Sequence, residues 1–203
     1  GPVPLVMFLH GMGERGVDNR RQLKFGVGDL VKWIKESGTE AMVLAPQCPP
    51  DDLWSPFDNV TRDLTKREKP TRALALVLQM IDDLGLKAGV VDPRRVYLTG
   101  LSMGGYGTWE ALWRRPELFA AAIPVCGGGV REEAAAIKHI PVWAFHGAID
   151  NAVPVQQSRT MIRALEKAGG KPKYTEYKDW GHSVWTPTYR NPKVYEWLFA
   201  QSK

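Results

Sequence analysis

The chain has 203 residues, 44% of them hydrophobic, which is enough to bury one sizeable core, so a single domain over residues 1–203 is expected. Its net charge of +5 comes from basic residues interleaved with acidic ones, as in "TKREKP". Dispersed charge of this kind is typical of a solvated surface and argues against a nucleic-acid partner. No apolar stretch approaches the roughly 18 residues of a membrane span, so we expect no membrane insertion.

The sequence opens at "GPVPLVMFLHG", almost directly inside an apolar run and without a cationic leader. A leader that has been removed would indicate a secreted or periplasmic protein, and otherwise a cytoplasmic location is expected. Localisation and oligomeric state therefore stay open. The two cysteines, Cys48 and Cys126, form no C-x-x-C metal or redox motif.

Short apolar runs typical of buried parallel strands alternate with segments of helical spacing. The runs that predict strands are "PLVMFLH", "AMVLAP", "RVYLTG", "AAAIPVC", "PVWAFHG" and "KYTEYK". The segments that predict helices are 29–37, 71–85, 103–114, 155–168 and 189–201. This alternation predicts an α/β fold with a mainly parallel sheet of about six strands and helices on both faces.

The clearest helical pattern lies in "TRALALVLQMIDDLG", where Gly85 is expected to end the helix. The apolar residues that recur on one face are Leu74, Val77, Leu78, Ile81 and Leu84. The stretch before this helix, from about 46 to 70, shows no period. We expect it to form a loop at the strand ends.

The segment "GLSMG", residues 100–104, joins a predicted strand to a predicted helix without room for an ordinary loop. Glycine inside a helix costs about 0.5–1 kcal/mol relative to alanine, so helix propensity does not explain these residues. A G-x-S-x-G sequence in this setting is typical of a nucleophile elbow, which exposes the serine hydroxyl on a strained turn. Ser102 is therefore the candidate nucleophile, with Gly100 and Gly104 placed where a side chain would collide. The alternative is a tight glycine turn without chemistry.

A serine hydroxyl is a weak nucleophile and needs a general base, and the chain has four histidines. His10 and His146 end strands, where a ring is expected to brace a loop. His139 lies in a connection between a helix and a strand. By elimination, His182 is the best candidate, because it follows the last strand in a glycine-containing turn.

The base needs an acid that orients it, and hydrolases of this architecture place that acid between the serine and the histidine in the chain. Asp150 lies just past a strand in "AFHGAIDNAVP" and fits this order. Asp179 is the competitor. It lies only three residues from His182 and is expected to be exposed, which makes it the weaker candidate.

The segments "LHGMGERG", "APQCP", "GLSMGGYGTW", "HGAIDNAVPV" and "GHSVW", in this order, resemble the α/β-hydrolase superfamily. The resemblance is to small bacterial carboxylesterases that are related to dienelactone hydrolases and often described as predicted peptidases, and it spans essentially the whole chain. Members usually begin with antiparallel strands upstream of the match to "FLHG", and the printed sequence starts without them, so the edge of the sheet stays open.

The resemblance implies that Ser102 is the nucleophile, His182 the general base and Asp150 the acid that fixes its tautomer. It also implies an oxyanion hole made by the backbone N–H groups of Met12 and Met103. The resulting acyl-transfer chemistry needs neither a metal nor an organic cofactor.

Six residues in or beside the predicted strand-end loops are candidates for the substrate pocket, although a structural loop contact explains each of them equally well. They are Glu14, Arg15, Trp54, Tyr106, Trp180 and Trp185. Only "CGGGVREEAAAIKH" separates the strand ending near Val125 from the next strand, so no large cap domain is expected over the pocket.

These features predict a serine carboxylesterase acting on small acyl or aryl esters, with esters on plant polysaccharide as one option. A peptidase or an acyl-thioesterase of the same fold is an alternative. A non-catalytic binding module on a hydrolase scaffold is another, although such modules usually lack a triad residue and none is missing here.

The strand order of the resembling family also bears on the cysteines. In that order two strands separate the strands that precede Cys48 and Cys126, which is about 14 Å, whereas the Cα atoms of a disulfide lie within about 7 Å. Both cysteines are therefore expected to be free thiols.

Overall fold

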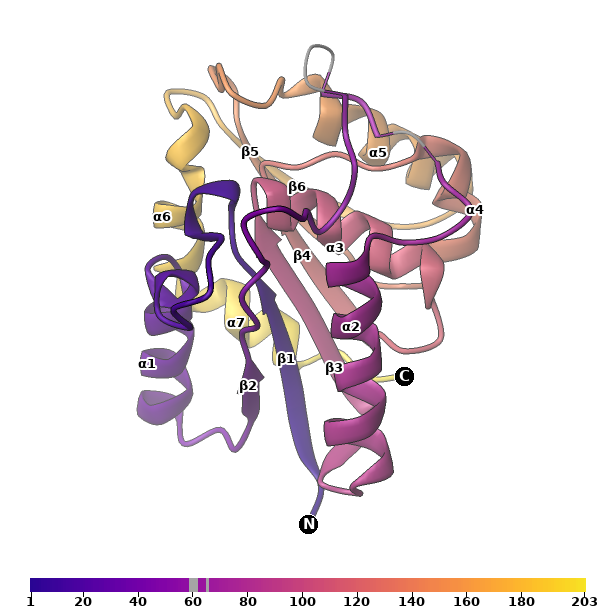
Figure 1. Cartoon of the computed structure of the whole chain (residues 1–203). Helices are drawn as coiled ribbons and strands as arrows, with labels where there is room; N and C mark the ends of the chain where they lie inside the picture. Colours follow the sequence, from indigo (N-terminus) through magenta and orange to yellow (C-terminus); the bar gives the residue numbers. More distant parts are fainter. Residues whose placement is uncertain (59–61, 65) are drawn as a thin grey trace.

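The computed structural model describes residues 1–58, 62–64 and 66–203, with the side chains of 84–86 left out. Six strands form one sheet in the order β2-β1-β3-β4-β5-β6, and all five neighbouring pairs are parallel. The predicted α/β architecture is thus confirmed (Figure 1). The strands are β1 (Val3–Leu9), β2 (Met42–Leu44), β3 (Val91–Leu101), β4 (Ala121–Val125), β5 (Trp143–Gly147) and β6 (Lys173–Tyr177).

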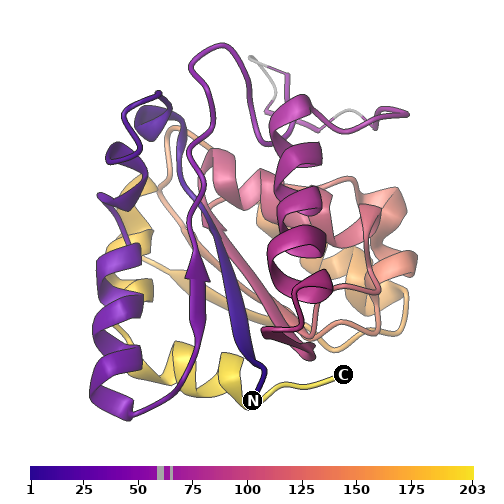
Figure 2. The same ribbon diagram turned by 60° about the horizontal axis from the view of Figure 1, so that its bottom comes forward.

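Helices cover both faces of the sheet, as Figures 1 and 2 show. One face carries α1 (Val27–Ser37), α6 (Trp185–Tyr189) and α7 (Pro192–Phe199). The other carries α2 (Arg72–Met80), α3 (Met103–Arg114), α4 (Ala134–Ile137) and α5 (Gln156–Lys167). Short 3-10 turns are η1 (Met12–Glu14), η2 (Arg21–Leu23), η4 (Arg131–Glu133) and η5 (His182–Val184). Among the described residues, no helix combines the length and the apolar character that a membrane span requires.

The strand β1 shows why the sheet is buried on both sides. Successive side chains of a strand point to opposite faces. Accordingly, Leu5, Met7 and Leu9 join the core under α2 to α5. Val6 and Phe8 join the core under α1, α6 and α7. The unbroken apolar run of this strand is therefore the pattern of a strand covered on both faces.

Two predicted helices differ in extent from the observed ones. The helix predicted over 71–85 does not end at Gly85, because α2 continues as a π-helix, η3 (Ile81–Lys87), and the predicted face residue Leu84 lies outside the described side chains. The helix predicted over 189–201 is observed as the shorter α7 alone, because Tyr189 still belongs to the separate helix α6 and a division falls inside the predicted range. The division falls where Asn191 caps the backbone N–H of Lys193 and Pro192, which has no N–H, occupies the first turn.

The long connection between β2 and α2 is fixed to α3 at two places. Near its middle, the hydroxyl of Ser55 donates to the buried carboxylate of Glu110. Further along, Arg114 pairs with Glu110 at 2.7 Å and donates to the carbonyl oxygens of Arg67 and Glu68. A buried charge pair needs such additional hydrogen bonds to repay its desolvation. The described parts of the connection are therefore fixed at the carboxyl ends of the strands.

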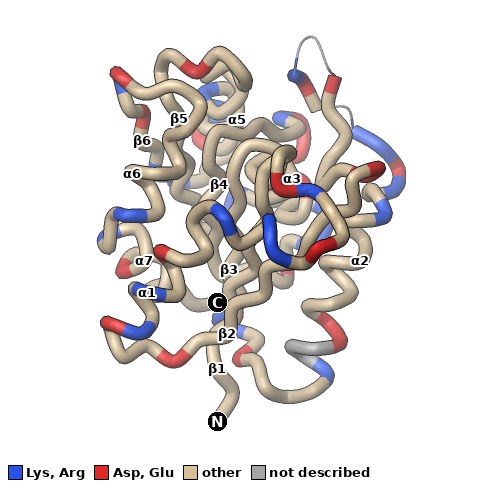
Figure 3. The backbone as a smooth tube through the Cα atoms, turned by 60° about the vertical axis from the view of Figure 1, so that its left-hand side comes forward, with Lys and Arg blue, Asp and Glu red and all other residues tan. Residues whose placement is uncertain are grey.

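The strand order also places the cysteines as expected. Cys48 follows β2 and Cys126 follows β4, with β1 and β3 between them, and both thiols are buried and free. The surface charges are mixed as well. Figure 3 shows basic and acidic residues scattered along the backbone.

The packing of α3 on the sheet explains the glycines around Ser102. A Cβ atom on Gly104 would overlap the carbonyl oxygen of Leu9, and one on Gly100 would overlap the carbonyl oxygen of Gly104. These obstacles are backbone atoms, which cannot turn aside as a side chain can. The first turn of α3 therefore lies directly against the ends of β1 and β3.

We predict that Gly104→Ala lowers the free energy of unfolding by about 3 kcal/mol or more, because the added methyl group forces two backbone segments apart. Gly28→Ala in α1 is the matched control, since nothing lies within 4 Å of the new Cβ there. We expect that change to be neutral or to stabilise by up to about 1 kcal/mol. Urea unfolding of both variants measures the difference. Equal stability of the two variants would contradict the packing argument.

Candidate active site

Ser102 lies at the junction between β3 and α3 in a strained conformation. Its φ of 55° and ψ of −118° fall in a region that residues other than glycine rarely occupy. The turn is held because the Ser102 N–H donates to the carbonyl oxygen of Val125 at the end of β4, at 2.9 Å. The strain is the cost of lifting the hydroxyl above the carboxyl edge of the sheet.

Three side chains form a continuous hydrogen-bond relay at this edge. His182 Nε2 lies 2.8 Å from the Ser102 hydroxyl, and His182 Nδ1 lies 2.7 Å from Asp150 Oδ2. The Asp150 side chain is fully buried, while that of His182 is 26% exposed. The structure thus brings together the three residues that the sequence selects. The competitor, Asp179, lies exposed in the turn after β6.

The Asp150 carboxylate is surrounded by donors. Oδ1 accepts the backbone N–H groups of Ala152 and Val153, at 2.8 and 2.9 Å. Burial raises the pKa of Asp150, but hydrogen bonds from His146, His182 and Val153 outweigh it and hold the pKa well below its usual value. The carboxylate therefore stays ionised and can accept a hydrogen bond from the Nδ1–H group of His182.

The two residues predicted to supply the oxyanion hole, Met12 and Met103, each begin a helical segment. Met103 is the first residue of α3 and Met12 is the first residue of η1, so neither N–H has an acceptor within its own helix. Both residues line the same cavity as Ser102 and His182. Arg15 holds the loop just after Met12, because its side chain donates to the carbonyl oxygens of Met12 and Asp52, both at 3.2 Å.

The cavity at Ser102 has a volume of about 180 Å³ and a largely apolar wall. Its lining residues are Met12, Phe57, Arg62, Ser102, Met103, Tyr106, Ala152, Val153 and His182. The ring of Phe57 stacks on Tyr106, and the Tyr106 hydroxyl donates to the carbonyl oxygen of Arg62. Tyr106 is thus the one of the six sequence-derived pocket candidates that lines this cavity.

The structure corrects the expectation for Trp54. This side chain is 1% exposed and packs in the core, where its indole N–H donates to the carbonyl oxygen of His10 at 3.0 Å. Glu14 is also buried, and burial raises its pKa. Trp180 is exposed and does not line the cavity. Trp185 does not line it either, but its ring packs edge-on against that of His182, with 5.3 Å between the ring centroids.

The cavity also contains residues that sequence reasoning missed. Phe57 and Arg62 come from the long connection, which has no periodic pattern, and only the tertiary contacts of that loop bring them to Ser102. Ala152 and Val153 could have been found, because they lie two and three residues after Asp150 in the same strand-end turn.

His10 braces the loop after β1, as expected from its position at a strand end. Its Nε2 accepts the backbone N–H of Cys48 at 2.9 Å, so its proton lies on Nδ1, which donates to the carbonyl oxygen of Gly11. Burial lowers the pKa of His10, which favours this neutral form. His139 is exposed between α4 and β5.

Cys126, Asp150 and His182 bring a thiol, a carboxylate and an imidazole within 4.8 Å of one another, the one such group among the residues that the structure describes. Asp150 and His182 already use their facing atoms on each other. Burial raises the pKa of the Cys126 thiol well above its usual value, which disfavours the thiolate that binds metals. This group is therefore a poor metal site as it stands.

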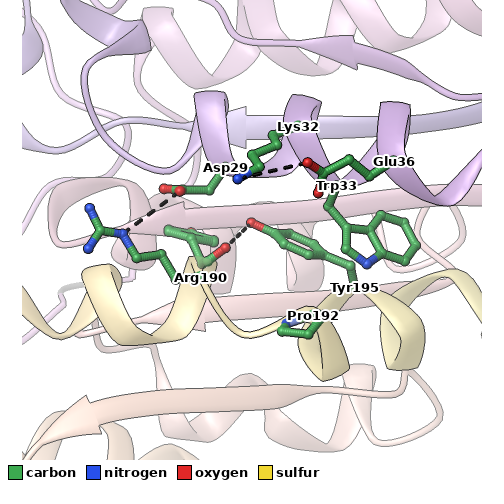
Figure 4. Close-up of a pocket in the computed structure, with 8 residues that line it drawn as sticks. Asp29, Lys32, Trp33, Glu36, Arg190, Pro192 and Tyr195 are labelled. Atoms are coloured by element: carbon green, nitrogen blue, oxygen red, sulfur yellow. Dashed lines mark hydrogen bonds and ion pairs between the residues drawn. The ribbon is translucent and has the colours of Figure 1, made fainter.

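A larger groove, of about 530 Å³, lies between α1 and the α6–α7 segment (Figure 4). Its rim carries the ion pairs Asp29–Arg190 and Lys32–Glu36, at 3.9 and 3.8 Å, and Trp33 and Tyr195 lie in its wall. No member of the Ser102 relay lines it. The smaller cavity is therefore the candidate active site, because it alone among the described cavities contains a positioned hydroxyl and base.

Comparison with known proteins places the chain in a family. A model of the Phospholipase/Carboxylesterase family matches residues 2–192. The chain belongs to this phospholipase/carboxylesterase family. A solved structure described as a thermostable esterase is 44% identical, with a TM-score of 0.90 over 100% of this chain and 56% of its own.

Two curated proteins are also similar. A protein of Arthroderma benhamiae named "Uncharacterized secreted protein" is 27% identical over 89% of this chain and 21% of its own length. A bifunctional acetylxylan esterase/xylanase of Neocallimastix patriciarum is 34% identical over 46% of this chain and 14% of its own length. This phospholipase/carboxylesterase family member thus spans a minor part of both curated relatives.

Because His10 is buried, we expect the folding stability of this member of the phospholipase/carboxylesterase family to fall at acid pH. Because its folded-state pKa lies below the unfolded value of about 6.5, the unfolded chain binds a proton first as the pH falls. We expect this residue to reduce the free energy of unfolding, below about pH 6.5, by up to about 1.4 kcal/mol per pH unit. His10→Gln keeps an acceptor for Cys48 without titrating, so its stability should depend less on pH. Parallel unfolding profiles of the two proteins between pH 7.5 and 5.5 would contradict this.

Proposed function

We propose that this chain is a serine carboxylesterase that hydrolyses short-chain acyl or aryl esters through an acyl-enzyme on Ser102. The observation that carries the proposal is the unbroken relay from the buried Asp150 carboxylate through His182 to the Ser102 hydroxyl. Membership of the phospholipase/carboxylesterase family supports the same reaction class.

The reaction follows from the relay. His182 Nε2 takes the Ser102 proton while the hydroxyl oxygen attacks the ester carbonyl carbon, and Asp150 stabilises the imidazolium that forms. The N–H groups of Met12 and Met103 hold the negatively charged oxygen of the tetrahedral intermediate. His182 then gives its proton to the leaving alcohol. Water, activated by the same histidine, releases the acid from Ser102.

The dimensions of the site favour a small acyl group. The cavity of about 180 Å³ is below the range of about 300–1,000 Å³ that is usual for drug-sized ligands. Its apolar wall of Phe57, Ala152 and Val153 suits a short hydrocarbon chain or a ring. No residue of the segment between β4 and β5 lines this cavity, and Ala134 and Ile137 of α4 are buried in the core.

The leaving group is a second part of the proposal. We include acyl groups carried on polysaccharide, because one similar protein is named as an acetylxylan esterase/xylanase. Release of acetate from acetylated xylan tests this class directly. Peptide and acyl-thioester substrates assayed in parallel distinguish an esterase from a peptidase or a thioesterase. Labelling by a fluorophosphonate separates all three from a non-catalytic module.

The proposed roles predict how three substitutions change turnover of p-nitrophenyl acetate. Ser102→Ala and His182→Ala should each lower kcat by something on the order of 10⁶, and Asp150→Asn by less. Asp179→Asn is the matched control and should leave kcat nearly unchanged. Ordinary turnover by Ser102→Ala would refute the nucleophile. A loss in Asp179→Asn with full activity in Asp150→Asn would assign the acid to the other residue.

The small cavity predicts a limit on acyl length. Each buried methylene contributes about 0.8 kcal/mol, but only while the cavity can hold it. We therefore expect acetyl to butyryl p-nitrophenyl esters to have higher kcat/KM than octanoyl and longer ones, and detergent interfaces to give no activation. The series is measured at fixed pH, below the solubility limit of the longer esters. A steady rise to decanoyl would reveal an acyl tunnel.

A further inference from the structure

His146 is a buried histidine that the proposed reaction does not use. It lies on β5, four residues before Asp150, and is fully buried. Its Nδ1 lies 2.8 Å from the hydroxyl oxygen of Ser158 on α5. Its Nε2 lies 3.0 Å from the carbonyl oxygen of Val153 and 3.3 Å from Asp150 Oδ2.

The partners of the ring determine where its proton lies. The Ser158 hydroxyl can donate either to Nδ1 or to the carbonyl oxygen of Gly127, which is 3.0 Å away, so this contact leaves Nδ1 free to donate or to accept. Nε2 has no such freedom. A carbonyl oxygen and a carboxylate oxygen both face it, and both are acceptors only. Nε2 therefore carries a proton, which is directed at Val153 and Asp150.

This N–H completes the shell of donors around the Asp150 carboxylate. Oδ1 receives two backbone N–H groups from the turn that follows Asp150. Oδ2 receives His182 Nδ1 on one side of the relay and faces His146 Nε2 as well. With both oxygens occupied, the carboxylate cannot rotate without losing a buried hydrogen bond, which is costly in a low-dielectric interior.

We propose that His146 is a positioning residue for the catalytic relay: its Nε2–H fixes the orientation of Asp150 and reduces the negative charge that Asp150 presents to His182. The inference rests on the proposed esterase function. Other charged or titratable groups near the ring belong to neighbouring elements. They are Glu176 on β6 with its partners Arg159 and Tyr174, and Cys126 at the end of β4 beside Asp150.

The chain offers a matched pair of variants at this position. In His146→Gln the side-chain amide nitrogen can take the place of Nε2 and donate to Val153 and Asp150. In His146→Asn the shorter amide can take the place of Nδ1 and keep the Ser158 contact, but it leaves Asp150 without this donor. Ser158→Ala is the control, since it alters the packing of the ring and leaves Nε2 in place.

For His146→Asn we expect kcat for p-nitrophenyl acetate to fall about tenfold with KM within twofold, because the base is less well oriented. The acid limb of the pH profile of kcat/KM should move up by about half a pH unit, because His182 then faces a less neutralised carboxylate. In His146→Gln and Ser158→Ala the acid limb of this profile should stay at its wild-type pH, and kcat should stay within threefold of the wild-type value. Equal behaviour of the Asn and Gln variants, or a loss of kcat without movement of the limb, would show a purely structural role and overturn the proposal.

A measurement on the unaltered protein decides the matter even if a variant fails to fold. Nitrogen-15 NMR of the histidine rings reports which nitrogen carries a proton. We expect Nε2 of His146 to stay protonated throughout the pH range of activity, and an unprotonated Nε2 would overturn the proposal. Absence of ester hydrolysis in the wild-type protein would instead refute the esterase function, and the NMR result would remain independent of it.

Discussion

The contact between the first turn of α3 and the end of β1 is the constraint on which the whole site depends. Gly104 lies against the carbonyl oxygen of Leu9 with no room for a side chain, so helix and strand ends meet backbone to backbone. That contact places Ser102 at the start of α3 and Met12 at the start of η1 beside each other. The proposed nucleophile and the loop proposed to supply an oxyanion donor are therefore positioned by the same backbone contact.

Three of the four histidines show that the groups around an imidazole ring, rather than the residue type, determine its role. His10 offers Nε2 as an acceptor to Cys48 and joins two loops. His182 contacts the Ser102 hydroxyl through one nitrogen and Asp150 through the other, and it is the one of these two that reaches solvent. His139, by contrast, is exposed in the connection between α4 and β5. What each ring nitrogen faces therefore makes His10 a brace and His182 the proposed base.

The strands and most helices could be predicted from the sequence because their signal is local. The period of "RVYLTG" and the glycines after it indicate a buried strand, a tight turn and a helix in one short segment. The residues that meet at Ser102 could likewise be predicted from chain order and strand-end position. Part of the cavity wall could not, because the positions of Phe57 and Arg62 depend on how a loop without a period is tied to α3.

Trp54 is a residue that the sequence wrongly suggests as part of the pocket. A tryptophan in a strand-end loop looks like a pocket residue when only its neighbours in the chain are considered. Its indole N–H finds the carbonyl oxygen of His10, 44 residues away, and this partner makes full burial possible. The division of the last helix at Pro192, by contrast, could have been predicted, since proline after asparagine is a recognised helix start.

The two anchors of the long connection have a consequence for how such a scaffold diversifies. Ser55 holds the loop to Glu110, and Arg114 holds it again at Arg67 and Glu68. Between these points Phe57 and Arg62 line the cavity, and none of the described residues belongs to a strand of the sheet. If the proposed function holds, substitutions and changes of length in this interval can alter which esters are accepted while the core and the relay keep their geometry. Selection for new substrates and selection for stability would then act on different residues of the chain.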